Sequence, residues 1–313
     1  MRRLLLLLLF LLAGCAPVDT ARAQSPDMPT EAVTPSERAY FRLASWNVRN
    51  LFDDIDDPYY DETPNTQEYQ AKLRELVAVV EEVEADFIAL QEVENLASLS
   101  EMNSLLKNPY PQVGLIEGND QMRGIDVAFL SRLPVREVIS HAALDLPVQA
   151  GEQRTHRFSR DCLEVRLDTE PSVVVLINHF KSARGDAKKS AQKRRAQAEG
   201  VVQIASALAP EEAVFIVGDL NGRQDEWALE PLFQLFQDPF AGLPQETRIT
   251  HRYKKGGSAL DHILLDPEAA ELSSNARIWS DVARETSDHN PVSVELSLGK
   301  VVPAPAKVWA EGR

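Results

Sequence analysis

Short apolar runs recur along this chain, and segments with helical spacing of apolar residues lie between some of them. The runs are rich in Val, Ile, Leu and Phe, which favours β-strands. We expect strands at FRLASWN (41–47), DFIALQ (86–91), DVAFLS (126–131), CLEVRL (162–167), SVVVLIN (172–178), AVFIVG (213–218), LDHILL (260–265) and PVSVELSL (291–298). We expect helices over 66–84, 96–107, 187–208 and 226–236.

The first of these helices has the clearest pattern. Its apolar residues, from Leu73 to Val83, recur at helical spacing, and Asn65 followed by Glu68 resembles a capping box. Several of the expected strands follow one another with no helix between them, which argues against a simple doubly wound sheet. The pattern instead predicts an α/β fold with two mixed sheets and helices outside.

The first residues predict an export signal rather than part of the fold. Arg2 and Arg3 precede an apolar run, Leu4 to Leu12, that is too short to span a bilayer as a mature helix. The following Ala-Gly-Cys resembles a bacterial lipobox, so residues 1–15 are expected to direct export and Cys15 to be lipidated. An ordinary cleaved signal peptide is the alternative. Either way, we expect an exported protein, which is lipid-anchored in the cell envelope, or secreted if the lipobox is not used.

The rest of the chain divides into three parts by composition. Residues 16–38 are rich in Pro, Ala, Thr and Ser, which predicts a flexible tether. Residues 39–299 are long enough for one large domain, and 300–313 are expected to form a loose tail. If Cys15 carries lipid, Cys162 has no partner for an intramolecular disulfide.

The formal net charge is −15 at pH 7, which limits the choice of partners. Such a field repels polyanions at long range and argues against a protein whose task is high-affinity nucleic-acid binding. It permits an enzyme that meets phosphates through a local basic patch and a bound metal ion.

Polar side chains gather where the expected strands end. The stretch VGDLNGR (217–223) places a carboxylate and an amide directly after an apolar run, and taken alone it favours a turn. The same placement recurs along the chain, which suggests that the groups converge at one rim. The residues concerned are Asn47, Glu92, Asn178, His179, Asp219, Asn221, Asp261, His262, Asp288 and His289.

This set of side chains suits a particular chemistry. Carboxylates and amides with few imidazoles favour Mg²⁺, Mn²⁺ or Ca²⁺ over zinc, and no local Cys–His or His-x-x-x-His pattern indicates a zinc site. There is neither a Gly-x-Ser-x-Gly elbow nor a Walker loop. Acids, amides, histidines and a hard metal ion together predict hydrolysis of a phosphate ester.

The motifs also carry a resemblance. SWNVRNLFD, ALQEVEN, GIDVAFLSR, INHFKSARG, VGDLNGR, LDHILL and SDHNPVSVEL, in this order over residues 41–298, resemble the endonuclease/exonuclease/phosphatase superfamily with its DNase I-like fold. The resemblance implies a four-layer α/β/β/α sandwich, with two mixed β-sheets packed face to face and helices outside. The histidine in INHFKSARG favours members similar to secreted bacterial nucleases over apurinic-site endonucleases.

The resemblance assigns metal binding to three positions and water activation to two. It implies that Asn47 and Glu92 bind the metal ion, with Asp288 on the metal side of the same site. It further implies that Asp219 orients or deprotonates the attacking water and that Asn221 holds the phosphate or the water nearby. The expected ion is Mg²⁺, with Mn²⁺ or Ca²⁺ as alternatives.

The resemblance assigns the remaining roles at the phosphate. His179 would donate a hydrogen bond to its oxygens, and His289 would act at the scissile phosphate, with Asp261 fixing its tautomer. Lys181 and Arg184 lie closest in sequence to His179 and are expected to bind substrate phosphate. The basic run that follows, DAKKSAQKRRAQAEG, either tracks a nucleic-acid backbone or forms a solvated helix face.

Two further segments receive structural interpretations. His262 follows Asp261 and is expected to point to the opposite face of the strand. The acidic loop 53–62 is expected to be solvated, with a secondary Ca²⁺ site as the alternative.

The expected function is metal-dependent phosphodiester hydrolysis by a cell-envelope nuclease that cleaves DNA or RNA. The alternatives are a phospholipid or inositol-phosphate phosphoesterase of the same fold, similar to sphingomyelinases, and a non-catalytic binding lipoprotein. We expect nucleic acid as the substrate, a lipid anchor in the membrane, no protein partner and a monomer.

Overall fold

The computed structural model describes residues 40–56, 63–146, 155–253, 256–282, 285–299 and 301–310. The expected export signal (1–15), the lipidated Cys15 and the expected tether (16–38) lie outside the described residues.

Most of the strands belong to two mixed sheets. The larger has the order β12 (Ser273–Ile278), β13 (Val292–Leu296), β1 (Phe41–Leu51), β2 (Phe87–Val93), β4 (Asp126–Ser131), β3 (Gln112–Leu115) and β14 (Lys307–Trp309). The smaller has the order β11 (Asp261–Leu265), β8 (Ala213–Asp219), β7 (Val173–His179), β6 (Cys162–Leu167) and β5 (Val135–Ser140). A hairpin of β9 (His251–Tyr253) and β10 (Gly256–Ser258) stands apart from both.

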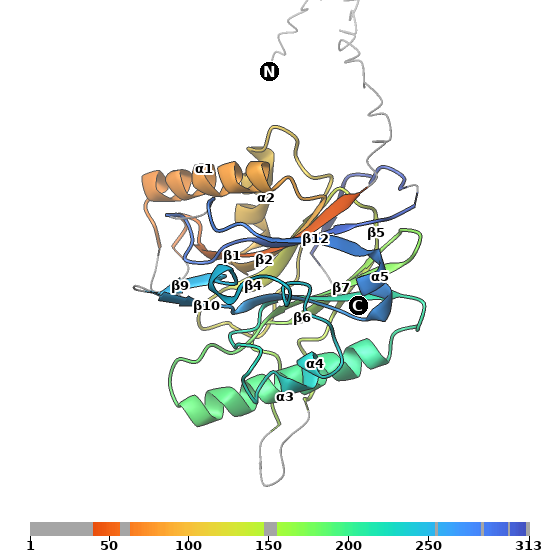
Figure 1. Ribbon diagram of the computed structural model, residues 1–313. Helices are drawn as coiled ribbons and strands as arrows, with labels where there is room; N and C mark the ends of the chain where they lie inside the picture. Colours follow the sequence, from red (N-terminus) through yellow and green to blue (C-terminus); the bar gives the residue numbers. More distant parts are fainter. Residues whose placement is uncertain are drawn as a thin grey trace, which may run out of the picture. The chain divides into compact units, whose positions relative to one another are not determined.

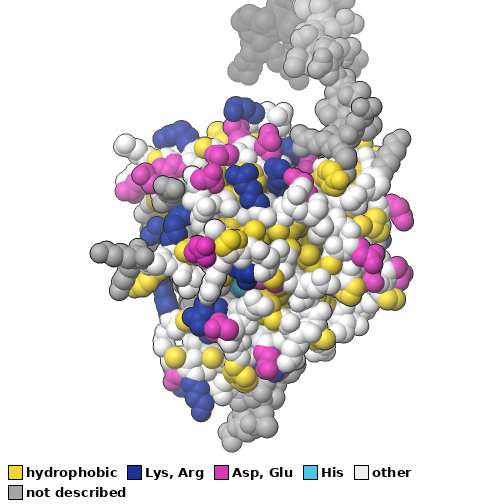
Figure 2. Space-filling view, viewed as in Figure 1, with side chains coloured by type: hydrophobic (Ala, Val, Ile, Leu, Met, Phe, Trp, Pro, Cys, Tyr) yellow, Lys and Arg dark blue, Asp and Glu magenta, His cyan; other side chains and the backbone are white. Residues whose placement is uncertain are grey.

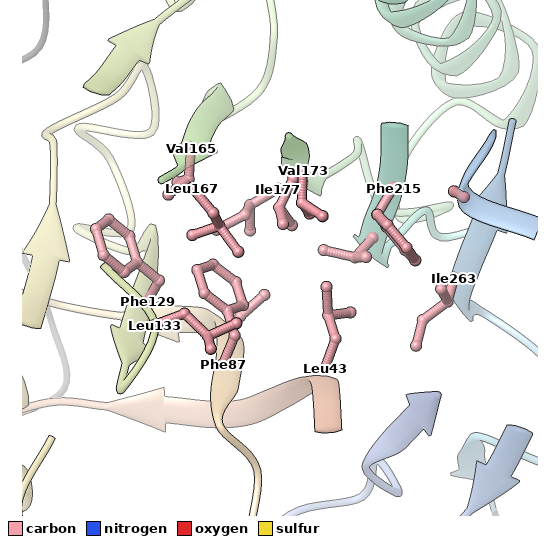
Figure 3. Close-up of a cluster of buried hydrophobic side chains, with 14 of the residues drawn as sticks. Leu43, Phe87, Phe129, Leu133, Val165, Leu167, Val173, Ile177, Phe215 and Ile263 are labelled. Carbon is pink, nitrogen blue, oxygen red and sulfur yellow. The ribbon is translucent and has the colours of Figure 1, made fainter. Parts of the chain in front are cut away.

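The two sheets pack face to face over a shared apolar core. Leu43, Phe87 and Phe129 of the larger sheet meet Ile177, Phe215 and Ile263 of the smaller one, and all are fully buried (Figure 3). The rings of Phe87 and Phe129 stack with centroids 5.7 Å apart. This core arises because alternate side chains of a strand point to opposite faces, so one face of each apolar strand supplies the inner layer.

The outer faces of both sheets are covered by helices (Figure 1). α1 (Thr66–Val83) and α2 (Leu96–Ser104) bury the apolar outer face of the larger sheet, and α3 (Ala187–Ser206) and α4 (Glu230–Phe233) bury that of the smaller sheet. A short α5 (Pro267–Leu272) and a 3₁₀ turn, η1 (Gln245–Thr247), complete the helical segments of the described residues. The predicted four-layer sandwich is thereby confirmed.

The capping box predicted for the first helix is present. The Asn65 side chain accepts a hydrogen bond from the Glu68 backbone N–H at 3.0 Å, and the Glu68 carboxylate accepts one from the Asn65 N–H at 3.0 Å. The helix predicted over 226–236 is wrong in length, because only Glu230–Phe233 is helical. The chain before it forms turns instead, with hydrogen bonds from the Glu226 N–H to Arg223 O and from the Leu229 N–H to Glu226 O, both at 3.0 Å. Glu226 also pairs with Arg194 of α3.

The predicted loose tail also differs from the structure. Lys307–Trp309 form β14, which pairs in parallel with β3 at the edge of the larger sheet. The indole N–H of Trp309 donates to Gln112 Oε1 at 3.1 Å, and its ring packs against the core between the sheets. The segment covers a strand edge that otherwise exposes unpaired backbone groups. A strand of three residues is too short to be predicted from its sequence pattern.

One face of the described residues carries both signs of charge. On the face drawn in Figure 2, acidic and basic side chains are interspersed rather than gathered into regions of one sign.

No helix among the described residues has the length and apolar character needed to cross a bilayer.

Two buried carboxyl groups lie where β4 and β6 begin. Asp126 accepts a hydrogen bond from the Gly118 N–H at 2.8 Å, and burial raises its pKa to about 7. Asp161 accepts from the His141 N–H at 2.8 Å, and burial raises its pKa to about 6. Both pKa values exceed those of an unfolded chain, so protonation of these groups favours the folded state.

We therefore expect Asp126→Asn to stabilise the protein in a pH-dependent way. The folded-state pKa is raised, so the contribution of Asp126 to stability is fully present below about pH 4 and is lost as the pH rises through about 7. The amide retains the acceptor for Gly118 without a charge. The melting temperature should rise by about 2–4 °C at pH 8 and stay unchanged at pH 4, by scanning calorimetry. Exposed Asp168→Asn is the control; an equal shift at both pH values would contradict the prediction.

Candidate active site

The predicted site residues come from the ends of neighbouring strands in both sheets. In the smaller sheet, His179 of β7 lies opposite Asp219 of β8, and Asp219 lies opposite Asp261 of β11. Residues paired in this way share one face of a sheet. In the larger sheet, Asn47 of β1 and Glu92 of β2 reach the same rim, since the Asn47 amide touches both Glu92 and Asp219.

The backbone is distorted where the larger sheet reaches the site. The register between β1 and β2 shifts after Asn47, and that between β2 and β4 shifts between Gln91 and Val93. Arg49, Asn50 and Glu92 have φ angles of 53°, 54° and 66°, in the left-handed region. Such bulges redirect side chains next to active sites, and here they aim the Glu92 carboxylate at the other sheet.

A glycine lets β7 and β8 approach each other closely just before Asp219. Gly218 has a φ of 129°, and a Cβ at this position would lie 1.9 Å from the Asn178 carbonyl oxygen. The GDLN motif therefore needs its glycine for backbone packing, and this packing sets the position of Asp219.

Amide groups surround the Asp219 carboxylate. Asn47 Nδ2 donates to Asp219 Oδ2 at 3.1 Å and lies 3.3 Å from Glu92 Oε1. Asn221 donates to the same carboxylate through its backbone N–H at 2.9 Å and through Nδ2 at 3.1 Å. Burial raises the pKa of Asp219 to about 6. A carboxyl group with this pKa can accept a proton near neutral pH.

His179 lies between the two sheets' carboxylates and is buried. Its Nε2 is 3.5 Å from Asp219 Oδ2 and 3.8 Å from Glu92 Oε1. Burial, reinforced by the positive charge of Arg160, holds its pKa well below the usual value. His179 is therefore a neutral imidazole that can offer one N–H to a substrate oxygen.

His289 has the partner that the sequence predicts. Its Nδ1 is hydrogen-bonded to Asp261 Oδ2 at 2.7 Å, and its Nε2 lies 3.9 Å from Asp219 Oδ2. Burial alone would lower the pKa of His289, but the Asp261 carboxylate outweighs burial and raises the pKa to about 10. The imidazolium thus donates Nδ1–H to Asp261 and presents Nε2–H to the site.

Asp288 has different neighbours from the other predicted metal ligands. Its Oδ1 lies 3.9 Å from Arg49 Nε, and its Oδ2 lies 3.7 Å from His251 Nε2. Burial raises the pKa of Asp288, but His251, His289 and Arg49 outweigh burial and lower the pKa to about 2. Sequence reasoning missed His251, because a histidine in a three-residue strand has no local signal.

Two arginines that the sequence reading did not select border the acids. Arg123 Nη2 donates to Asn50 Oδ1 at 2.7 Å and lies 3.5 Å from Glu92 Oε2. Arg160 is buried, pairs with Asp120 at 2.7 Å, and interacts electrostatically with Glu92. Their only sequence signals are their positions, directly before the GIDVAF motif and before the CLEVRL strand.

Lysines extend this positive cluster, whereas the predicted Arg184 is exposed in the loop. The ammonium group of Lys181 donates to backbone oxygens of its own loop, including Arg184 O at 3.3 Å. Burial and the nearby Arg160 lower the pKa values of both Lys181 and Lys193, which indicates that these cations lie close together.

Part of the basic run is engaged in packing and does not face the site. Arg194 pairs with Glu226, and Arg195 pairs with Glu199 and Glu230 while lying over the Trp227 ring. These two arginines hold α4 and its preceding loop against α3. The structural role predicted for His262 is confirmed, because this buried histidine hydrogen-bonds the Gly222 carbonyl at 2.9 Å.

The acidic segment after β1 also contributes to structure. Asp53 accepts hydrogen bonds from the Ile55 N–H and from Asn95 Nδ2, both at 2.9 Å, so this carboxylate is buried and already satisfied. Residues 57–62 of the predicted acidic loop lie outside the described residues.

The oxygen donors fit a hard divalent cation. Glu92 and Asp219 approach each other from the two sheets, and Glu92 presents both oxygens at the partly exposed rim. Carboxylates of this kind bind Mg²⁺, Mn²⁺ or Ca²⁺. Asn47 faces these acids through Nδ2, while its Oδ1 accepts from the Arg49 N–H at 2.9 Å. In this arrangement, Asn47 Nδ2 bridges the Glu92 and Asp219 carboxylates, and its role as a metal ligand stays a prediction.

A cavity of about 660 Å³ opens beside this rim. It is lined by Arg49, Asn50 and Phe52 at the end of β1 and by Tyr69 and Lys72 of α1. Its lining is part apolar and part charged, which suits the group that flanks a phosphate in a larger substrate.

Comparisons with known proteins agree with this geometry. A model of the Endonuclease/Exonuclease/phosphatase family matches residues 44–289. Comparison with curated protein sequences finds no match.

Solved structures with a similar fold cover most of this chain. A humanized D. rerio TDP2 has 19% identity over 82% of this chain and 99% of its own, with a TM-score of 0.60. D. rerio TDP2 complexed with a single-strand DNA product has 18% identity over the same shares, with a TM-score of 0.59. An endonuclease/exonuclease/phosphatase from Beutenbergia cavernae has 19% identity over 84% of this chain and 72% of its own, with a TM-score of 0.56.

We expect Asp219→Asn to abolish most turnover of a chromogenic phosphodiester while the protein stays folded. The amide cannot accept a proton, so kcat should fall by about 10²–10⁴. Asp225→Asn, at an exposed carboxylate that pairs with Arg223, is the matched control and should keep its kcat. A folded Asp219→Asn protein that retains more than about a tenth of wild-type kcat would refute the role.

Proposed function

We propose that this chain, which belongs to the endonuclease/exonuclease/phosphatase family, is a cell-envelope nuclease that uses Mg²⁺ to cleave DNA or RNA. Its fold is the DNase I-like sandwich, and the family makes it a hydrolase of phosphoric esters. The nucleic-acid substrate, the magnesium ion and the envelope location are the parts that we propose.

One observation carries the hydrolase chemistry: acids and histidines from four strand ends and the His289 loop meet at a single rim. His179, Asp219 and Asp261 stand in one row of paired strands, and Glu92 enters from the opposite sheet. Strand ends hold such groups more rigidly than free loops do.

The residues divide the work of water attack on phosphorus. Asp219, with a pKa of about 6, accepts the proton of the attacking water, and Asn221 keeps that carboxylate oriented. His289 Nε2–H and His179 offer hydrogen bonds to the phosphate oxygens as negative charge develops. Glu92 would hold a divalent cation, which when bound would stabilise charge at the phosphate and at the leaving oxygen.

Local positive charge supports a polyanionic substrate in spite of the negative net charge. Arg123, Arg160, Lys181 and Lys193 lie close enough to interact with one another beside the carboxylates. Such a cluster attracts a phosphodiester backbone over the distance of a Debye length, although the whole chain repels it. The D. rerio TDP2 structure with a bound DNA product provides a precedent for the fold.

An exposed aromatic side chain adds to this support. Tyr253 of β9 is 63% exposed and its ring stacks on His251, which in turn contacts His289. A tyrosine so close to a phosphate site can stack on an unpaired base.

A substrate panel tests the proposal directly. The purified chain should hydrolyse plasmid DNA, single-stranded DNA or RNA in Mg²⁺, lose activity in EDTA, and leave sphingomyelin and inositol phosphates intact. Turnover of the lipid or the inositol phosphate alone would move the assignment to that branch of the family. Absence of metal-dependent turnover on every phosphoester would favour a binding lipoprotein and overturn the proposal.

The envelope location rests on the sequence of residues 2–15. We propose that lipid on Cys15 anchors the chain to a bacterial membrane. Fractionation of expressing cells tests this proposal, because the Cys15→Ser variant should be lost from the membrane fraction.

We expect the lysines beside Arg160 to affect substrate binding more than chemistry. Lys181→Gln combined with Lys193→Gln should raise KM for DNA several-fold with little change in kcat, and should reduce the salt slope of binding by about 1–2. Lys188→Gln combined with Lys189→Gln, at exposed positions in the first turn of α3, is the matched control and should change both less. Equal effects of the two pairs would show that the basic run acts only through general charge.

A further inference from the structure

A second group of metal-ligating side chains shares His289 with the active-site group of Asp219, Asp261 and His289. His251, Asp288 and His289 each offer one ligand atom, and these atoms lie within 4.8 Å of one another. His251 Nε2 is 3.7 Å from Asp288 Oδ2, and the two imidazole rings have centroids 4.6 Å apart. None of these distances involves Glu92, which faces Asn47 and His179 instead.

The backbone holds the two histidines opposite each other. An isolated antiparallel bridge pairs His251 with His289, with hydrogen bonds from the Arg252 N–H to Asp288 O and from the Asn290 N–H to Thr250 O. Side chains directly opposite in such a pair project to the same side. This arrangement comes from the fold and is independent of any ion.

Two contacts fix β9 in this position. The hydroxyl of Thr250 accepts hydrogen bonds from the backbone N–H groups of Leu260 and Asp261, both at 2.9 Å. His251 also pairs with Ser258 in the β9–β10 hairpin. The histidine is therefore tied to the strand that carries the partner of His289.

His289 is already oriented as metal-binding histidines usually are. Its Nδ1 is committed to Asp261 Oδ2 at 2.7 Å, which leaves Nε2, 3.9 Å from Asp219 Oδ2, as the nitrogen available to an ion held with His251 and Asp288. A carboxylate on the far nitrogen fixes the tautomer and increases the basicity of a ligating imidazole. A metal ion at Nε2 replaces the proton that this nitrogen otherwise carries.

The donor set selects a different class of ion from the oxygen ligands around Glu92. Two imidazoles and one carboxylate suit Zn²⁺ and neighbouring transition metals, whereas Mg²⁺ prefers oxygen. A Zn–N distance of about 2.0–2.1 Å places ligand atoms about 3.3 Å apart, so the 3.7 Å pair needs only a small contraction. Arg49, half exposed, meets the other Asp288 oxygen at 3.9 Å and can turn outward.

We propose that His251, Asp288 and His289 form a transition-metal site, separate from the Mg²⁺ site, and that Zn²⁺ bound there inhibits hydrolysis. Inhibition follows because the ion occupies Nε2 of His289, the atom assigned to the substrate phosphate. This second part rests on the proposed function, whereas binding of the ion does not.

Direct metal binding tests the site in the full-length chain. With millimolar Mg²⁺ present throughout, calorimetric titration should show one Zn²⁺ bound per chain. Co²⁺ should give visible absorption bands of nitrogen ligation. His251→Gln should weaken Zn²⁺ binding at least about 10-fold and remove the Co²⁺ bands. His141→Gln, which alters a histidine paired with Glu164 away from the site, is the matched control and should bind as wild type.

Two more measurements separate the site from the Mg²⁺ site. Glu92→Gln should retain Zn²⁺ binding, and the Mg²⁺-dependent activity of His251→Gln should resist Zn²⁺ concentrations that inhibit wild type. Zn²⁺ binding that is unchanged in His251→Gln, or that is displaced by Mg²⁺ or lost in Glu92→Gln, would overturn the proposal. Calorimetry and absorption report binding without turnover. Zn²⁺ binding by a protein that shows no turnover in Mg²⁺ without Zn²⁺ would therefore support this site and refute the nuclease assignment.

Discussion

Buried carboxylates converge at one rim, and the rest of this site is arranged to compensate their charge. Asp219 and Asp261 are nearly inaccessible to water, and Glu92 approaches them from the other sheet. Buried charges of like sign must be hydrogen-bonded or paired, or the fold loses stability. Asn47, Asn221 and the His289 imidazolium meet this need with donors.

The same donors explain how the carboxylates acquire different properties. Asp261 receives the imidazolium of His289 at 2.7 Å, whereas Asp219 receives mostly neutral amide groups and has a raised pKa. One carboxylate thus orients a histidine, and the other can accept a proton. Environment separates the roles of residues that are chemically alike.

The strained backbone at the rim is maintained by contacts from outside the site. Left-handed residues cost about 1–3 kcal/mol each and persist only where their surroundings enforce them. The ammonium group of Lys72 in α1 donates to the backbone oxygens of Val48, Arg49 and Thr286, and so clamps the end of β1 to the loop that leads to His289. Burial lowers the pKa of Lys72 to about 8, which shows how far this cation has been drawn from water.

The sequence by itself determined the long apolar strands, the first helix with its capping box and the polar groups at the strand ends, because these depend on neighbours a few residues away. The strands that it predicted are β1, β2, β4, β6, β7, β8, β11 and β13, whereas β3, β5, β9, β10, β12 and β14 were not predicted. It also indicated that Asp261 and His262 face opposite sides of one strand. Only the tertiary structure decided which polar ends meet. The row of His179, Asp219 and Asp261, the approach of Arg160, the pairing of β14 and the meeting of His251 with His289 all depend on register between distant segments. Strand register is set by packing of whole sheets, so a local pattern carries no record of it.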